Sequence, residues 1–184
     1  MHVSQHITLR DGSVIALRSL EKQDTGAAIF CLRKVSGETE FLMREISECG
    51  MTLAQEEEII QRKAESPREL LLGAFAENEL IGMAGLNACG PYARVRHRAS
   101  VGLSLLRAHW GKGIGTLIIG MLVKFAFEQE KTDVLHCLCE DYNLRSRRIW
   151  EKNGFSLILT EPIPQPHKGK FEYHYRLTKE EYRK

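Results

Sequence analysis

The chain of 184 residues lacks the cysteine patterns that mark two common classes of protein. It has only five cysteines, an odd number, and they are scattered at spacings that match no zinc site. Cysteines of this kind suit a reducing compartment better than a disulfide framework. We therefore expect neither a disulfide-stapled fold nor a bound metal.

Long hydrophobic runs are also absent. The longest, Leu117 to Val123, is far shorter than the ~20 residues that cross a bilayer. The N-terminal segment has no apolar centre of the kind found in secretory signals. These features predict a cytoplasmic protein with no membrane partner.

The chain has little excess charge of either sign. Lys and Arg number 26 and Asp and Glu 24, which gives a net charge of +2 at pH 7, and the two signs are interleaved. A strong basic stripe for nucleic acid is therefore not expected. The length and a hydrophobic content of 43% suit one domain over residues 1–184, with a substantial core and no internal repeat.

The most informative stretch that is present runs from Trp110 to Thr116, with the sequence WGKGIGT. Glycines at 111, 113 and 115 let a ligand approach the main chain closely. Residues 94–106 before them alternate between polar and apolar, as in a half-buried strand, and residues 113–129 after them show one apolar helical face. The start of such a helix offers free N–H groups and a positive dipole end, so it predicts a phosphate or pyrophosphate site.

Two familiar nucleotide motifs do not fit this stretch. A Walker-type loop needs Ser or Thr after its lysine, but Lys112 is followed by Gly113. A dinucleotide fingerprint needs glycine at its sixth position, where Thr116 stands. Nucleoside triphosphate hydrolysis and dinucleotide binding are therefore not predicted.

The stretch instead resembles the acetyl-CoA pyrophosphate loop of the GNAT N-acetyltransferase superfamily, in which Gly113 and Gly115 take the motif's glycine positions. Trp110 departs from the usual Gln or Arg. A second block resembles the family's downstream motif in the correct order, through Asn143, Ser146, Trp150, Gly154 and Phe155. The resemblance implies a mixed α/β fold: a mostly antiparallel twisted sheet, one parallel pair of strands splayed around the cofactor, and helices on both faces.

The local patterns predict elements that agree with this fold. We expect strands over 7–17 (broken by a turn at 11–12), 70–76, 80–86, 94–106, 134–139, 155–159 and 171–177. We expect helices around 28–35, from a capping box at Thr52 and Gln55 to about Ala64, over 113–129, and over 143–152. Prolines 162, 164 and 166 exclude a central strand between the last two.

The resemblance implies that acetyl-CoA is held mainly by backbone groups of the glycine loop. The cofactor-binding residues that it implies are Leu105, Gly111, Lys112, Gly113, Ile114, Gly115, Thr116, Asn143, Ser146 and Trp150. For Asn143 a second role, as N-cap of the following helix, is compatible with this one.

The implied reaction is direct attack of a neutral amine on the acetyl thioester. Ser100 lies where some relatives carry a glutamate base, so Glu140 is the substitute that we predict, against the alternative of an ordinary exposed acid. Trp150 lies where the family often has a tyrosine acid, and an indole N–H cannot take that role. Water, Tyr142 or direct release would replace it, and we expect Trp150 to pack on the pantetheine arm.

The sequence leaves the acceptor open. Acids at 38, 40, 45 and 48 surround Phe41 and Leu42, which hints at a cationic amine, although a solvated acidic face explains them as well. The leading hypothesis is an N-acetyltransferase acting on a primary amine of a small molecule or protein. The alternatives are a noncatalytic acetyl-CoA sensor or scaffold and an O-acyltransferase. If the strand at 171–177 lies at the sheet edge, it offers a surface through which a homodimer could form.

Overall fold

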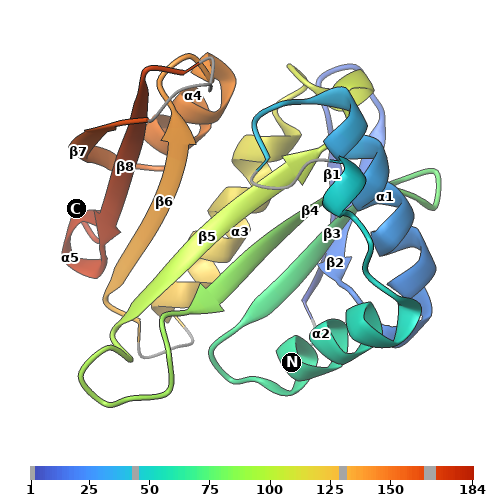
Figure 1. Ribbon diagram of the computed structural model, residues 1–184, viewed down its shortest axis with the longest axis horizontal. Coiled ribbons are helices and arrows are strands. Elements are labelled where there is room, and N and C mark those ends of the chain that lie inside the picture. Colours follow the sequence, from blue (N-terminus) through green and yellow to red (C-terminus); the bar gives the residue numbers. More distant parts are fainter. Residues whose placement is uncertain (1–2, 43–45, 129–131, 164–168) are drawn as a thin grey trace.

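The computed structural model describes residues 3–42, 46–128, 132–163 and 169–184, and this part of the chain contains one mixed sheet (Figure 1). Its strands are β1 (Ser4–Thr8), β2 (Val14–Ser19), β3 (Leu70–Ala76), β4 (Glu79–Ala88), β5 (Arg98–Leu105), β6 (Val134–Glu140), β7 (Ser156–Pro162) and β8 (Phe171–Thr178). They lie in the order β1-β2-β3-β4-β5-β6-β8-β7. Only β5 and β6 pair in parallel, and the other neighbours are antiparallel.

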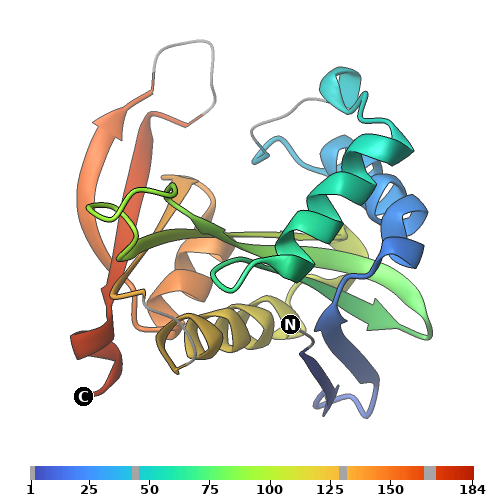
Figure 2. The ribbon, with the colours of Figure 1, turned by 90° about the horizontal axis from the view of Figure 1, so that it is seen from below.

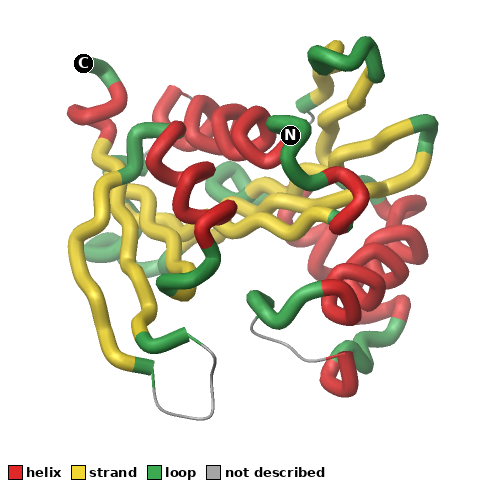
Figure 3. The backbone as a smooth tube through the Cα atoms, turned by 90° about the horizontal axis from the view of Figure 1, so that it is seen from above, coloured by secondary structure: helices red, strands yellow, loops and turns green. Residues whose placement is uncertain are grey.

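Helices cover both faces of the sheet, which Figure 2 shows nearly edge-on. The helices are α1 (Thr25–Glu38), α2 (Leu53–Glu65), α3 (Ile114–Glu128), α4 (Leu144–Lys152) and α5 (Lys179–Tyr182), with short 3-10 turns at η1 (Lys22–Asp24), η2 (Ile46–Glu48) and η3 (Arg107–His109). One face carries α1 and α2, and the other carries α3 and α4 (Figure 3). The predicted fold class is confirmed.

The core lies mainly between α3 and the middle of the sheet. Ile118, Ile119 and Leu122 of α3 are fully buried, as are Leu72 of β3 and Leu86 of β4. Burial of each such side chain contributes about 1.5–3 kcal/mol relative to exposure. The glycine loop therefore leads directly into a helix that is held firmly against the sheet.

The predicted turns and caps are found in the structure. Glu77 and Asn78 both have positive φ, of 48° and 69°, and form the two-residue turn between β3 and β4. The Thr52 hydroxyl accepts a bond from the Gln55 N–H at 3.3 Å, and the Thr52 N–H donates to the Gln55 side chain at 2.9 Å. The capping box at the start of α2 is thus confirmed.

One predicted strand boundary is wrong, and the condition for pairing through the strand at 171–177 is not met. The strand predicted over 94–106 begins only at Arg98, because the Val95 N–H donates to the Tyr92 carbonyl and the Arg98 N–H to the Val95 carbonyl, which makes this segment a turn. The strand at 171–177 is not an edge, since β8 lies between β6 and β7. The edge strand on this side of the sheet is β7, and Pro162, its last residue, fits that position.

No helix among the described residues is long and apolar enough to cross a membrane.

Candidate functional site

The parallel strands β5 and β6 separate after a short contact. They pair only at Arg98 with Val134, Ala99 with Leu135 and Ser100 with His136, although β5 continues to Leu105 and β6 to Glu140. Beyond Ser100, β5 stays paired with β4 on its other side, and β6 stays paired with β8. Two strand edges with unused backbone hydrogen-bonding groups therefore diverge, as Figure 1 shows. This is the splayed pair that the family resemblance implies.

The glycine loop lies at the open end of the diverging strands. Gly111 and Gly113 have φ of 78° and 85°, a region that disfavours other residues. The N–H groups from Gly111 to Thr116 donate no hydrogen bond to the described part of the chain. They surround the first turn of α3, where the helix dipole is positive. The loop can therefore hold an anion through its backbone.

Gly115 serves a different purpose from the two glycines before it. A Cβ atom on Gly115 would lie 2.7 Å from Cδ1 of Ile149 in α4 and 3.0 Å from Cδ2 of Leu103 in β5. The absence of a side chain thus lets α3 pack closely against both elements. A further link joins the two helices, because the Asn153 side-chain amide donates to the Thr116 carbonyl at 3.3 Å.

Trp110 ties the glycine loop to the end of β5. Its indole N–H donates to the Leu105 carbonyl at 2.7 Å. The guanidinium groups of Arg107 and Arg145 lie 5.7 Å and 5.2 Å from the centre of the indole ring. Two cationic groups from separate elements are therefore gathered beside the glycines, and exposed Lys112 lies in the loop itself.

The helix α4 follows the open end of β6. The Asn143 side-chain oxygen accepts a bond from the Ser146 N–H at 3.1 Å, which confirms the N-cap role. Trp150 of the same helix is only 3% exposed and packs edge-on against Phe155, with ring centres 5.6 Å apart. The indole thus belongs to the core, and its contact with a pantetheine arm stays a prediction.

The opposite face of the diverging strands is open and polar. Leu103 points to α3, so the alternating residues Ser100, Gly102 and Ser104 of β5 face the side of α1 and α2. A Cβ atom on Gly102 would meet nothing within 4 Å. On β6, His136 pairs with Ser100 and shares this face, which continues through residues 138 and 140.

Acidic and aromatic groups meet at the end of β6. Glu140 is half-buried, and its Oε2 atom is shielded from solvent without a hydrogen-bond partner among the described residues. The Tyr142 ring lies 4.9 Å from the Phe41 ring. Desolvation, followed by the charges of Glu140 and Glu40 and by hydrogen bonds to both, raises the pKa of Tyr142 to about 12. The tyrosine hydroxyl therefore stays protonated at neutral pH.

Two of the other predicted acids occupy different surroundings. Glu38 accepts a bond from the Arg107 N–H at 2.7 Å, so it ties the end of α1 to the loop after β5. Glu48 lies in η2, and Glu45 falls outside the described residues. The acids that lie beside Tyr142, just after the end of β6, are therefore Glu40 and Glu140.

His136 was missed by the analysis of the sequence. It lies at the point where β5 and β6 separate, and burial, with Arg98, Arg176 and His174 nearby, lowers the pKa of its imidazole. A neutral imidazole can accept a proton. Only the pairing register of β5 and β6 shows that His136 lies beside Ser100. The alternation of polar and apolar residues within β6 does not indicate which residue of a neighbouring strand lies opposite His136.

A comparison of the chain with protein-family models matches an acetyltransferase (GNAT) domain over residues 15–156. The chain belongs to the GNAT acetyltransferase family. The match contains the splayed strands, the glycine loop and α4.

Solved structures share the GNAT fold with this chain. An acetyltransferase of the GNAT family from Streptococcus pneumoniae is 21% identical, with a TM-score of 0.84 over 89% of this chain and 98% of that one. A putative acetyltransferase from Salmonella typhimurium, yncA, solved with its cofactor acetyl-CoA, is 16% identical, with a TM-score of 0.77 over 89% and 93%. A ribosomal-protein-alanine N-acetyltransferase from Brucella melitensis is 18% identical, with a TM-score of 0.74 over 88% and 98%.

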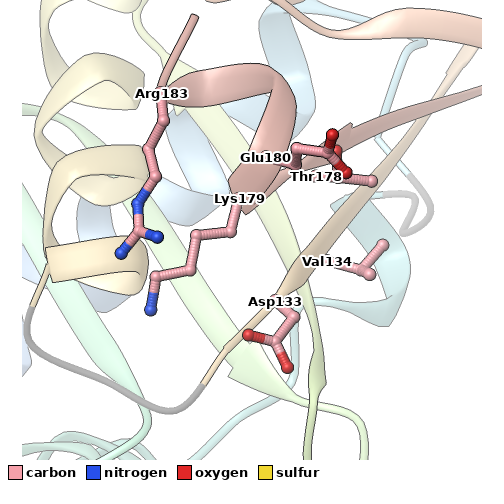
Figure 4. A pocket seen from close by; sticks show the side chains of 6 residues that line it. All are labelled: Asp133, Val134, Thr178, Lys179, Glu180 and Arg183. Carbon is pink, nitrogen blue, oxygen red and sulfur yellow. The ribbon is translucent and has the colours of Figure 1, made fainter.

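A separate hollow on the GNAT domain lies away from this site. It is lined by Asp133, Val134, Thr178, Lys179, Glu180 and Arg183 (Figure 4). These residues lie around the start of β6, the end of β8 and the short helix α5, where β5 and β6 are still paired. The hollow is therefore at the opposite end of β6 from the glycine loop.

Proposed function

We propose that the protein transfers an acetyl group from acetyl-CoA to a primary amine by direct attack. The observation that carries the proposal is the divergence of β5 and β6 directly before a loop of unpartnered N–H groups. An extended pantetheine arm has amides that can bond to a free strand edge, and a pyrophosphate suits the loop. Family membership and the neighbour that holds acetyl-CoA support the same cofactor.

Within this proposal the cofactor lies along one continuous track. Residues 111–116 hold the pyrophosphate, the β5 edge up to Leu105 holds the arm, and α4 borders it through Asn143, Ser146 and Trp150. The clustered charges of Arg107 and Arg145 beside Trp110 favour the phosphates. The five free cysteines support a reducing, cytoplasmic setting.

We assign the acceptor to the class of cationic amines. Glu40 and Glu140 flank the Tyr142 hydroxyl, and the rings of Phe41 and Tyr142 lie together. Carboxylates and aromatic faces both attract an ammonium group. The small side chain of Ser100 and the absence of one at Gly102 leave space on the same face for the amine to reach the thioester.

The attacking amine must first lose a proton, since a lysine-type amine has a pKa of about 10.4. Glu140 takes this proton in our proposal, because its unpartnered oxygen lies at the end of β6 where β5 and β6 have separated. N–H groups of the β5 edge polarise the acetyl carbonyl. The departing CoA thiolate receives its proton from water or from Tyr142, and the raised pKa of Tyr142 makes its hydroxyl a weaker acid than an ordinary tyrosine.

A thermal-shift measurement with acetyl-CoA, CoA and ATP tests the cofactor part of the proposal. Acetyl-CoA and CoA should raise the midpoint of unfolding in proportion to their affinity, and ATP should not. Thiol release is then measured against polyamines, amino acids, aminoglycosides and N-terminal peptides, with polyamines expected to react fastest. Absence of stabilisation by acetyl-CoA would contradict the proposal.

A second candidate function is a noncatalytic sensor or scaffold that binds acetyl-CoA. One observation favours it: Trp150 replaces the usual tyrosine acid, and its indole is buried in the core. Stabilisation by acetyl-CoA with no thiol release from any acceptor would support the sensor. Release with alcohols but not with amines would instead indicate O-acyl transfer.

A further inference from the structure

A second group of reactive side chains lies on the strands β7 and β8. One oxygen of Glu161 lies 2.9 Å from Nε2 of His174, and one oxygen of Glu172 lies 3.2 Å from the same nitrogen. The three ligand atoms all lie within 4.8 Å of one another. This group, which we call the β7–β8 triad, has no part in the acetyl-CoA track described above.

A β-bulge brings Glu161 to this face of the sheet. The register shifts between Leu157, which pairs with Tyr175, and Leu159, which pairs with His174, so that Ile158 has no partner. Glu161 then pairs with Glu172. Without the extra residue, Glu161 would stand opposite Phe171 and point to the other face, because side chains alternate along a strand.

The ligand atoms around His174 are spaced as the ligands of a single ion would be. The Nε2 atom is shielded from solvent and makes no hydrogen bond within the described chain, although two carboxylates lie within 3.2 Å of it. Both oxygens are therefore displaced from the direction in which the ring nitrogen bonds. Ligands at about 2.0–2.2 Å from one ion are separated by roughly 3 Å, which matches both contacts.

The two carboxylates of the triad share a single basic partner, His174. Glu140, Glu172 and Glu161 form one row of directly paired residues across β6, β8 and β7, and like charges in such a row are unfavourable. Within the described residues, His174 is the only basic side chain within ion-pair distance of Glu161 and Glu172. Arg176, the next residue on this face, is paired with Glu181 instead.

We propose that Glu161, Glu172 and His174 bind one divalent transition-metal ion, for which Zn²⁺ and Mn²⁺ suit the mixed carboxylate and imidazole ligands. The ion neutralises the two carboxylates and joins β7 to β8. Every residue of β7 is exposed, so few packing contacts hold this edge strand in place. A shared metal ion would therefore stabilise β7 more than the other strands. The exposed Leu138 and Leu159, on either side of His174, form an apolar surround.

The expectation that the protein binds no metal came from the cysteine spacing. A site of two glutamates and one histidine on two strands leaves no sign in that spacing. Its signal in the sequence, Glu172 and His174 at alternate positions, is common in solvated strands.

Titration calorimetry with ZnCl₂ and MnCl₂ tests the proposal on the full chain, without a histidine tag and after removal of metals with EDTA. We expect one equivalent to bind, and affinity to fall about tenfold or more in both His174→Gln and Glu161→Gln. His6→Gln, an exposed histidine on β1, is the matched control and should bind as the unmodified protein does.

A second readout is the midpoint of thermal unfolding, which bound metal should raise in the unmodified protein and in His6→Gln but not in His174→Gln. Failure to bind one equivalent of either ion would overturn the proposal. Equal binding by all the variants would overturn it as well, because that result would show adventitious binding elsewhere. Neither result depends on acetyl transfer.

Discussion

Trp110 shows how one residue can change the contacts that support a glycine loop. A Gln or Arg at this position offers a flexible polar side chain, whereas the indole of Trp110 donates to Leu105 and supports Arg107 and Arg145. The Leu105 carbonyl is thus engaged inside the protein. The loop keeps its backbone donors, which carry the anion site, and gains charge from neighbouring elements.

The role of Glu140 can be tested by a nearly isosteric change. Glu140→Gln keeps the volume and removes the proton acceptor, so we expect kcat to fall by about 10²-fold or more, with little change in acetyl-CoA affinity. Steady-state kinetics and calorimetry measure the two quantities. Glu128→Gln, an exposed residue at the end of α3, is the control. Full activity in Glu140→Gln would remove Glu140 from the mechanism and leave His136 as the group to test.

The residues of the candidate site differ in how far the sequence determines them. The open backbone conformation at glycines 111 and 113 was predictable, because positive φ is a local property of a loop, whereas their contact with a cofactor stays a prediction. His136 could not be found, since its importance comes from a pairing with Ser100 made more than thirty residues away in the chain. The packing of Trp150 against Phe155 is likewise a property of the assembled core.

At the scale of single elements, the loop before α3 should be sensitive to backbone conformation. Gly113 has φ of 85°, and a Cβ atom there would meet nothing within 4 Å, so Gly113→Ala acts through strain alone. We expect a loss of about 1–2 kcal/mol in stability and weaker binding of acetyl-CoA. Urea unfolding and calorimetry measure both. Gly26→Ala, which also has open space but lies in α1 and has no positive φ, is the control for added volume.

The start of α4 offers a test that separates a cap from a ligand contact. Asn143→Ala removes the oxygen that accepts from the Ser146 N–H and should lower the free energy of unfolding by about 1 kcal/mol. Asn143→Ser keeps a capping oxygen and should retain most of that stability. If acetyl-CoA affinity falls in both variants, Asn143 also contacts the cofactor. Unchanged affinity in both would restrict its role to the cap.

Most elements were predictable because their signals are local. The capping box at Thr52, the turn at Glu77 and Asn78, and the apolar face of α3 each depend on residues close in sequence. The strand start at Arg98 was missed because polar and apolar residues also alternate through the preceding turn. The place of β8 inside the sheet depends on which strand pairs with β6, and neither strand's own pattern decides that.

At the scale of the whole molecule, one ion pair joins the sheet to the first helix. Arg18 of β2 donates two bonds of 2.7 Å to Asp24, whose carboxylate also accepts from the Glu21 N–H at 2.8 Å. Burial alone would raise the pKa of Asp24, but these hydrogen bonds and the arginine charge outweigh it and lower the pKa below its ordinary value. The carboxylate therefore stabilises the fold in its ionised form.

Because of this ion pair, we predict that the free energy of unfolding depends on pH. Because the pKa of Asp24 is lower in the folded than in the unfolded state, its contribution is present above the ordinary pKa of about 3.9 and disappears as pH falls through the folded value. Asp24→Asn should be less stable than the unmodified protein at pH 7, and the difference should shrink below about pH 4. Urea unfolding between pH 3 and 7 measures it. A difference that is constant with pH would assign the effect to packing.

The central claim is that the splayed strands and the glycine loop serve acetyl transfer to an amine. The most direct test is the steady-state release of CoA thiol from acetyl-CoA by the purified protein, with and without a polyamine such as spermidine. We predict release over many turnovers that depends on the amine and weakens in Gly113→Ala. Binding of acetyl-CoA without amine-dependent release from polyamines, amino acids, aminoglycosides or N-terminal peptides would contradict the claim.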